Sequence, residues 1–279
     1  MFLRLYEVGP RDGLQVLNHE IPIDKRKKLL SLLSEANMKY IEVGSCVSPK
    51  VLPMRDSEHL SILTNTNCSM LVLNEKGYRR AIEGGYENIN INISLRDDFN
   101  EKNLGKGFEE ILAMYMRILD RNNKNKARAY ISHAFDENIP PTILYDLVDC
   151  LSWYCKTIVL CDTDGDASIK NIKHRIKQLR EPTFSLALHI HKGKGNYMEK
   201  VRVAYDLGVR EFDTSTVNFG GCINVDYPTA NISTIEMLRW AKEKQIPMEH
   251  FIDEEKLQEA QDYANLMCAE ASSSSSLRA

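Results

Sequence analysis

Hydrophobic positions along this chain gather in short runs, and each run is followed by a longer stretch of mixed character. The runs are about five to seven residues long and rich in residues that favour strands, so each predicts one β-strand. The stretches after them place apolar residues three and four positions apart, which predicts amphipathic helices. The predicted strands span residues 2–8, 40–44, 69–73, 88–93, 127–132, 157–161, 185–191 and 211–214.

The predicted helices alternate with these strands, and one more helix follows the last of them. They span residues 24–36, 57–63, 75–84, 107–121, 140–154, 169–179, 197–208, 232–244 and 253–268. Eight strand–helix pairs in 279 residues predict an α/β fold, a TIM (β/α)8 barrel with one extra C-terminal helix. An open doubly wound sheet is the alternative, but no Gly-x-Gly-x-x-Gly turn follows the first strand.

The same pattern predicts one domain rather than two. We expect residues 1–270 to form a single catalytic barrel domain. Residues 271–279 include five consecutive serines, which cannot bury apolar surface, so we expect them to form a flexible tail.

Polar residues stand at the carboxyl ends of several predicted strands, which is where barrels of this kind assemble their chemistry. They are Arg11, Asp12, Glu42, Asp162, His189, His191 and Asp213. Side chains alternate between the two faces of a strand, so His189 and His191 share one face. Because Leu188 and Ile190 suit the helix-covered face, we expect both histidines to point into the barrel.

Two interpretations of Arg11 and Asp12 follow. In the first, the two residues pair with each other on a surface turn before Gly13. In the second, Asp12 and the two histidines share a metal ion. With an added amide they would present two nitrogens and two oxygens, a set that accepts Mg²⁺ or Mn²⁺ when substrate oxygens complete an octahedron; zinc is the other candidate.

Composition excludes several classes of protein. Hydrophobic residues make up 43% and charged residues 27% of the chain, as in ordinary globular proteins, and the net charge of -3 gives no indication of nucleic-acid binding. Seven cysteines without a Cys-x-x-Cys pair argue against a disulfide framework or a structural zinc site. Met1 leads directly into the first strand and no apolar run approaches about 18 residues, so we expect a cytoplasmic protein without a membrane partner.

A glycine pair precedes one of these cysteines. Gly220 and Gly221 allow a sharp turn that would leave Cys222 on a loop over the barrel mouth. The alternative for Cys222, and our interpretation of the other six cysteines, is a small buried residue without a chemical role.

Several motifs together resemble one known family. They are 7–15 (Glu-Val-Gly-Pro-Arg-Asp-Gly-Leu-Gln), 41–50 (Ile-Glu-Val-Gly-Ser-Cys-Val-Ser-Pro-Lys), 162–165 (Asp-Thr-Asp-Gly), His189-Ile190-His191, and Gly220-Gly221-Cys222 with Asn231. In combination and order they resemble the 3-hydroxy-3-methylglutaryl-CoA lyase family, within the metal-dependent lyase and Claisen-condensing barrel superfamily. The similarity runs from about residue 2 to about residue 245.

The resemblance implies a reaction and a set of site residues. It implies a divalent metal on Asp12, His189, His191 and Asn231, a catalytic set of Arg11, Asp12, Glu42, Asp162, His189 and Cys222, and substrate contacts from Arg11, Gln15, Lys50 and Lys192. The resemblance also implies that Arg11 lies beside the thioester carbonyl and that Cys222 donates a proton. The implied reaction is a retro-Claisen cleavage of an acyl-CoA to acetyl-CoA and a β-keto acid, in a homodimer.

Two other functions stay open. Condensing synthases of the superfamily usually have Asp-Thr-x-Arg-Asp-Gly at the first motif, no loop cysteine and often a further regulatory domain, so this sequence agrees better with the lyases. A barrel that only binds a ligand or serves as a scaffold is the third possibility.

The sequence also departs from the lyase pattern. Lys192 stands where the family normally has Asp, residues 164–166 are more acidic than usual, and Cys222 is not followed by Pro. We therefore expect the metal-assisted chemistry to be kept and leave the acyl group open. Lys192 and Lys194 either pair with Asp164 or Asp166 or contact a substrate carboxylate or the CoA phosphates.

Overall fold

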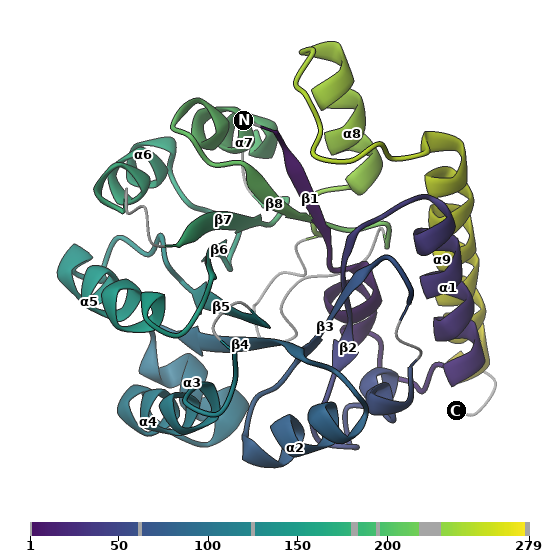
Figure 1. Cartoon of the computed structure of the whole chain (residues 1–279), viewed down its shortest axis with the longest axis horizontal. Helices are drawn as coiled ribbons and strands as arrows, with labels where there is room; N and C mark the ends of the chain where they lie inside the picture. The colour runs from purple at the N-terminus through teal and green to yellow at the C-terminus, as the bar shows by residue number, and fades with distance from the viewer. Residues whose placement is uncertain are drawn as a thin grey trace.

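A computed structural model describes residues 2–60, 63–123, 126–179, 184–193, 196–217 and 230–276. Eight parallel strands close into a barrel in sequence order, β1 to β8 (Figure 1). The strands are β1 Arg4–Glu7, β2 Tyr40–Ser45, β3 Asn67–Leu71, β4 Asn88–Ser94, β5 Ala127–Ser132, β6 Thr157–Asp162, β7 Ser185–Ile190 and β8 Glu211–Thr214. The predicted TIM barrel is confirmed, and the open sheet is excluded because β8 pairs with β1.

Helices surround the barrel, and a further helix lies beside the first one (Figure 1). They are α1 Ile23–Glu35, α2 Glu75–Glu83, α3 Asp97–Leu104, α4 Phe108–Leu119, α5 Pro141–Ser152, α6 Ile169–Gln178, α7 Tyr197–Asp206, α8 Thr234–Glu243 and α9 Glu254–Ser276. The extra helix is α9, which packs along α1 and adds the ion pair Lys25–Glu270 (2.5 Å). Within the part of the chain that the structure describes, none of these helices is both long and apolar enough to cross a membrane.

The expected helix at 57–63 is wrong. The connection after β2 contains two single 3₁₀ turns, η2 (Leu52–Met54) and η3 (Ser57–His59). Asp56 has a left-handed backbone (φ 58°) before η3, and Leu60 is extended after it. The buried side chain of Arg26 donates to the carbonyl of Arg55 (2.9 Å) and to Ser57 Oγ (2.7 Å). These tertiary contacts stabilise a compact turn where local periodicity favoured a helix.

The helix α3 is an addition that periodicity did not predict. Its one buried residue is Asn100, so it has no apolar stripe to produce a helical signal. The last helix also differs from expectation, because its backbone continues to Ser276, whereas we placed a tail from residue 271. The division into a catalytic domain and a flexible tail stays a prediction.

The barrel interior differs in character from the layer beneath the helices. Alternate strand residues such as Ile91, Leu160 and Leu188 belong to the main apolar core. A small apolar cluster of Leu71, Tyr130, Val159, Cys161 and Ala187 forms a separate group, and the other strand residues on the inner face are largely polar. This polar interior supports the residues at the carboxyl ends of the strands.

Candidate active site

The first site residues lie in a tight turn directly after β1. Residues Gly9–Gly13 form a single turn of π-helix (η1) there. Glycine is needed at its end, because a Cβ atom on Gly13 would come within 2.6 Å of Cβ of Val217. This close packing holds Arg11 and Asp12 at the carboxyl end of the barrel, where both are buried.

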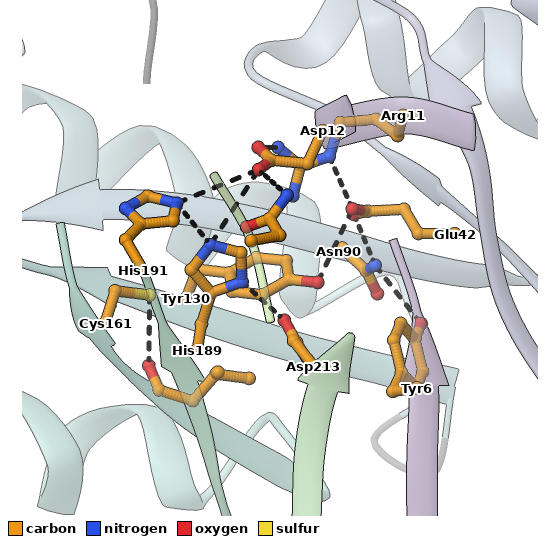
Figure 2. A network of polar contacts seen from close by, with 12 residues as sticks. Tyr6, Arg11, Asp12, Glu42, Asn90, Tyr130, Cys161, His189, His191 and Asp213 are labelled. Atoms are coloured by element: carbon orange, nitrogen blue, oxygen red, sulfur yellow. Dashed lines mark hydrogen bonds and ion pairs between the residues drawn. The ribbon is translucent and has the colours of Figure 1, made fainter. Parts of the chain in front are cut away.

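Asp12 meets the two histidines of β7 and its continuation (Figure 2). Nε2 of His189 and Nε2 of His191 lie 3.0 Å apart. Asp12 Oδ2 lies 3.8 Å from the first nitrogen and 3.9 Å from the second. One ligand atom from each of the three residues therefore falls within 4.8 Å of the others, which suits a single metal ion. The predicted convergence of these three residues is confirmed.

The other ring nitrogen of each histidine is held by an acceptor. Nδ1 of His189 lies 3.0 Å from Asp213 Oδ2, and Nδ1 of His191 lies 2.8 Å from the carbonyl oxygen of Thr163. A carbonyl or carboxylate oxygen only accepts, so each Nδ1 carries a hydrogen. Both Nε2 lone pairs are then directed at the same point, as in metal sites with oriented imidazoles.

Asn231 supplies the amide. An antiparallel bridge to His191 fixes its backbone, and its Nδ2 donates to Asp12 Oδ2 (2.8 Å). Its Oδ1 is buried and has no hydrogen-bond partner among the described residues. A buried carbonyl oxygen without a partner is costly. This oxygen, two imidazole nitrogens and one carboxylate fit a divalent cation, so the residues present agree with the metal that the resemblance implies.

Arg11 is held between two carboxylates. Its Nη1 pairs with Asp12 Oδ1, and its Nε pairs with Glu42 Oε2. Burial alone would raise the pKa of Asp12, but Arg11 and the two imidazoles outweigh it and hold that pKa well below its usual range. Gln15 Nε2 also donates to Asp12 Oδ1 (2.7 Å). The expected Arg11–Asp12 pair therefore exists, in the site rather than on a surface turn.

Glu42 orients Arg11 from the interior. Its Oε1 accepts a hydrogen bond from Asn90 Nδ2 (2.6 Å), and the Tyr130 hydroxyl lies 3.5 Å from Oε2 (Figure 2). Burial raises the pKa of Glu42, although Arg11 and Asn90 act in the opposite direction. The carboxyl is thus a fully enclosed partner of the guanidinium.

A second arginine, Arg128, supports His189 through Asp213. Arg128 on β5 pairs through Nη2 with Asp213, the acceptor of His189 Nδ1–H, and through Nη1 with Glu211. All of these side chains are buried. Asp213 is therefore shared by a cation and an imidazole, and its orientation is fixed from both sides.

Asp162 does not face the metal ligands. Val159 and Cys161 belong to the interior cluster, whereas Leu160 belongs to the core beneath the helices, so Asp162 continues the outward face of β6. Its Oδ1 accepts from the N–H of Ala167 (3.0 Å), and its Oδ2 accepts from Lys200 Nζ (2.6 Å). The structure thus does not bring Asp162 together with the other predicted catalytic residues.

The two predicted substrate lysines lie apart from the ligand set. Lys192 Nζ donates to Glu236 Oε2 (2.6 Å), so its partner is neither Asp164 nor Asp166. Lys50 is exposed in the turn after β2. Lys194 and Cys222 lie outside the described residues. The structure brings together Arg11, Asp12, Gln15, Glu42, His189, His191 and Asn231.

Sequence reasoning missed several supporting residues. For Asn90 a signal existed, because residues 88–92 read Asn-Ile-Asn-Ile-Asn and this alternation predicts a polar inner face. Arg128 and Tyr130 alternate with alanine and isoleucine in the same way. Lys200 gave no signal, since a lysine in an amphipathic helix is normally exposed.

The fold and the site define a class of protein. This is a closed parallel β/α barrel with a candidate divalent-metal site at the carboxyl ends of its strands. A family model described as HMGL-like matches residues 3–263. The chain belongs to the HMGL-like family.

Curated relatives and solved structures agree with this membership. The chain is 28% identical over 251 residues to a mitochondrial hydroxymethylglutaryl-CoA lyase of Bos taurus, covering 85% of this chain and 77% of the relative. It is 28% identical to a 3-hydroxy-3-isohexenylglutaryl-CoA/hydroxy-methylglutaryl-CoA lyase of Pseudomonas aeruginosa, covering 85% and 83%. An HMG-CoA lyase from Acinetobacter baumannii, solved with coenzyme A and 3-methylmalate, superimposes with a TM-score of 0.87 at 28% identity, covering 95% and 91%.

Proposed function

We propose that this protein is a metal-dependent carbon–carbon lyase. Its substrate is 3-hydroxy-3-methylglutaryl-CoA or a related 3-hydroxyacyl-CoA, and its products are acetyl-CoA and a β-keto acid, which is acetoacetate in the first case. The observation that carries the proposal is the convergence of Asp12, His189 and His191 with Asn231, directly beside Arg11. Oδ1 of Asn231 has no hydrogen-bond partner among the residues that the structure describes. The relatives that are hydroxymethylglutaryl-CoA lyases support the same activity.

Asp12, His189, His191 and Asn231 would hold the divalent metal. When bound, that ion supplies Lewis acidity, which favours deprotonation of a substrate hydroxyl group. Asp12 suits this ligand role because its low pKa keeps it ionised. The two histidines suit it because their Nδ1 atoms are engaged and only Nε2 is directed at the site.

Arg11 stabilises the negative charge that develops on the thioester oxygen. Burial alone would lower the pKa of Arg11, but Glu42 and Asp12 outweigh burial and raise it well above its usual value, so the guanidinium stays charged. Fixed donors directed at a developing oxyanion are typically worth about 3 kcal/mol or more. Glu42 keeps Arg11 in place, which is the role that we assign to it. Cleavage of the carbon–carbon bond releases the β-keto acid and leaves the enolate of the thioester. The carbon end of that enolate then receives a proton to give acetyl-CoA, and we keep Cys222 as the proposed donor.

Finer assignments belong to the same proposal. We propose Mg²⁺ or Mn²⁺ as the metal, because the carboxylate and amide oxygens together with substrate oxygens can complete an octahedron around such an ion. The acyl-CoA substrate is supported by the coenzyme A in the Acinetobacter baumannii structure. We also propose a cytoplasmic homodimer, on the basis of the family resemblance and the cysteine content.

The test is an assay of acetoacetate release from 3-hydroxy-3-methylglutaryl-CoA with Mg²⁺ or Mn²⁺. We expect activity in the wild type, loss in Asp12→Asn, and strong reduction in Cys222→Ala. The matched control is Asp149→Asn, which removes an exposed carboxylate on α5 and should leave activity intact. Free CoA released only from acetyl-CoA plus a keto acid would instead indicate the condensing reaction. Inertness towards a broad panel of acyl-CoA thioesters would leave the binding or scaffold role.

A further inference from the structure

A buried ion pair lies outside the ligand set and has no part in the proposed chemistry. Lys200 on α7 and Asp162 at the end of β6 are both buried, and Lys200 Nζ lies 2.6 Å from Asp162 Oδ2. The same Nζ donates to the carbonyl oxygen of Gly165 (2.8 Å). Lys200 therefore ties both ends of the turn 162–165 to one helix.

The start of α7 is fixed so that Lys200 can reach this turn. The side chain of Asn196 caps the helix by accepting from the N–H of Glu199 (3.2 Å). Lys200 follows one helical turn after Asn196. The chain before α7 packs directly on the turn, since a Cβ atom on Gly193 would lie 2.0 Å from the carbonyl oxygen of Gly165.

The turn held by Lys200 orients one metal ligand. Thr163 lies between the two tied residues, and its carbonyl oxygen accepts the Nδ1–H of His191 (2.8 Å). His189 is oriented independently, by Asp213 on β8. The two imidazoles thus have separate supports, and Lys200 acts on one of them alone.

We propose that Lys200 is a positioning residue for the metal site, which acts through Asp162, Gly165 and the Thr163 carbonyl to hold His191 with Nε2 directed at the metal. The inference rests on the metal site of the proposed function. It assigns Asp162 to the anchor of this turn rather than to acid–base chemistry. Removing a residue that orients a metal ligand typically lowers metal affinity about 10- to 100-fold.

The test measures Mn²⁺ affinity and the histidine tautomers in Lys200→Met. We expect Mn²⁺ binding to weaken about 10- to 100-fold. In metal-free protein, nitrogen NMR should show a mixture of tautomers for His191 and an unchanged Nδ1–H tautomer for His189. Burial alone would lower the pKa of His191, but the contact with Asp12 outweighs burial and raises it. The tautomers are therefore compared at alkaline pH, where the imidazole is neutral. The control is Arg202→Met, an exposed position on the same helix, which should stay within about twofold of wild type.

Lys200→Met leaves a buried carboxylate without its cation and can fail to fold. The double variant Lys200→Met/Asp162→Asn removes both charges and keeps an acceptor for Ala167, while the tie to Gly165 is still lost. We expect it to fold with weakened Mn²⁺ binding and the same selective effect on His191. A folded variant with wild-type affinity and an unchanged His191 tautomer overturns the proposal. Failure of both variants to fold assigns Lys200 to barrel stability and also overturns it.

These outcomes differ from failure of the proposed function. A wild type that binds Mn²⁺ but cleaves no acyl-CoA would remove the lyase assignment and leave the role of Lys200 intact. A wild type that binds no divalent metal would remove both.

Discussion

Asp213 Oδ2 lies 3.0 Å from Nδ1 of His189, and its other oxygen pairs with Arg128. A guanidinium only donates hydrogen bonds. In an Asp213→Asn variant, Arg128 therefore determines which atom of the new side-chain amide faces Nδ1 of His189. The amide oxygen must face Arg128, so the NH₂ group faces Nδ1. His189 then takes the Nε2–H tautomer, whose Nε2 cannot bind a metal.

Asp213→Asn should therefore lower Mn²⁺ affinity by about 10- to 100-fold, measured by titration calorimetry. Asp149→Asn is the control, since it removes an exposed carboxylate on α5. Wild-type affinity in Asp213→Asn would contradict the support that we assign to Asp213.

Metal binding should stabilise the folded chain through Asn231, whose Oδ1 has no hydrogen-bond partner within the described part of the chain. Free Mn²⁺ at about 100 times its Kd should raise the free energy of unfolding by about 2.7 kcal/mol, and a chelator should remove the gain. At the same Mn²⁺ concentration the gain should be smaller in Asn231→Ala and unchanged in Asn138→Ala, an exposed amide. Thermal unfolding with and without Mn²⁺ measures both, and equal gains in wild type and Asn231→Ala would exclude Asn231 as a ligand.

Glu7 should make stability depend on pH. Burial raises its pKa to about 7 from 4.5, although hydrogen bonds from Thr234, Thr216 and Gly9 act in the opposite direction. The folded chain thus binds a proton that the unfolded chain has lost between these two values. The resulting stabilisation is fully present below about pH 4.5 and is lost as the pH rises through about 7.

The change expected from Glu7 over this range is at most about 3 kcal/mol. In Glu7→Gln one amide oxygen can still accept from Gly9 and Thr216, and the NH₂ can donate to the Thr234 hydroxyl. We therefore expect this variant to gain stability over wild type as the pH rises from about 4.5 to about 7. Denaturant unfolding at several pH values measures the difference, and a pH-independent difference would show that Glu7 does not titrate in this range.

Substitution of Lys192 should distinguish an ion pair with Glu236 from a contact with the substrate. Lys192 donates to Glu236, and both side chains are partly exposed, so the pair contributes at most about 1 kcal/mol to stability. If that pair is its main role, Lys192→Ala should change KM for the acyl-CoA by less than about twofold, as should Glu236→Gln. Steady-state kinetics with each active substrate measures this. A large rise in KM for Lys192→Ala alone would show that Lys192 leaves Glu236 to bind substrate.

Several features could be predicted from the sequence because they depend on local periodicity. Eight alternations of strand and helix indicate a barrel, and the two-residue period of a strand directs His189 and His191 to one face. Since the carboxyl ends of parallel strands meet at one end of a barrel, Asp12 could be placed beside them although it is 177 residues away from His189 in the chain (189 − 12).

Other features depend on contacts between distant segments, and only the tertiary structure decided them. The sequence pattern predicted that the sixth strand ends at Cys161, whereas β6 continues through Asp162. The alternation of side chains along the strand therefore directs the Asp162 carboxylate outward, to Lys200. The turn after β2 is compact because Arg26 of α1 reaches into it. Local patterns determine which face a side chain takes, but a buried charge is stabilised by whichever partner the fold brings within reach, and no local pattern encodes that partner.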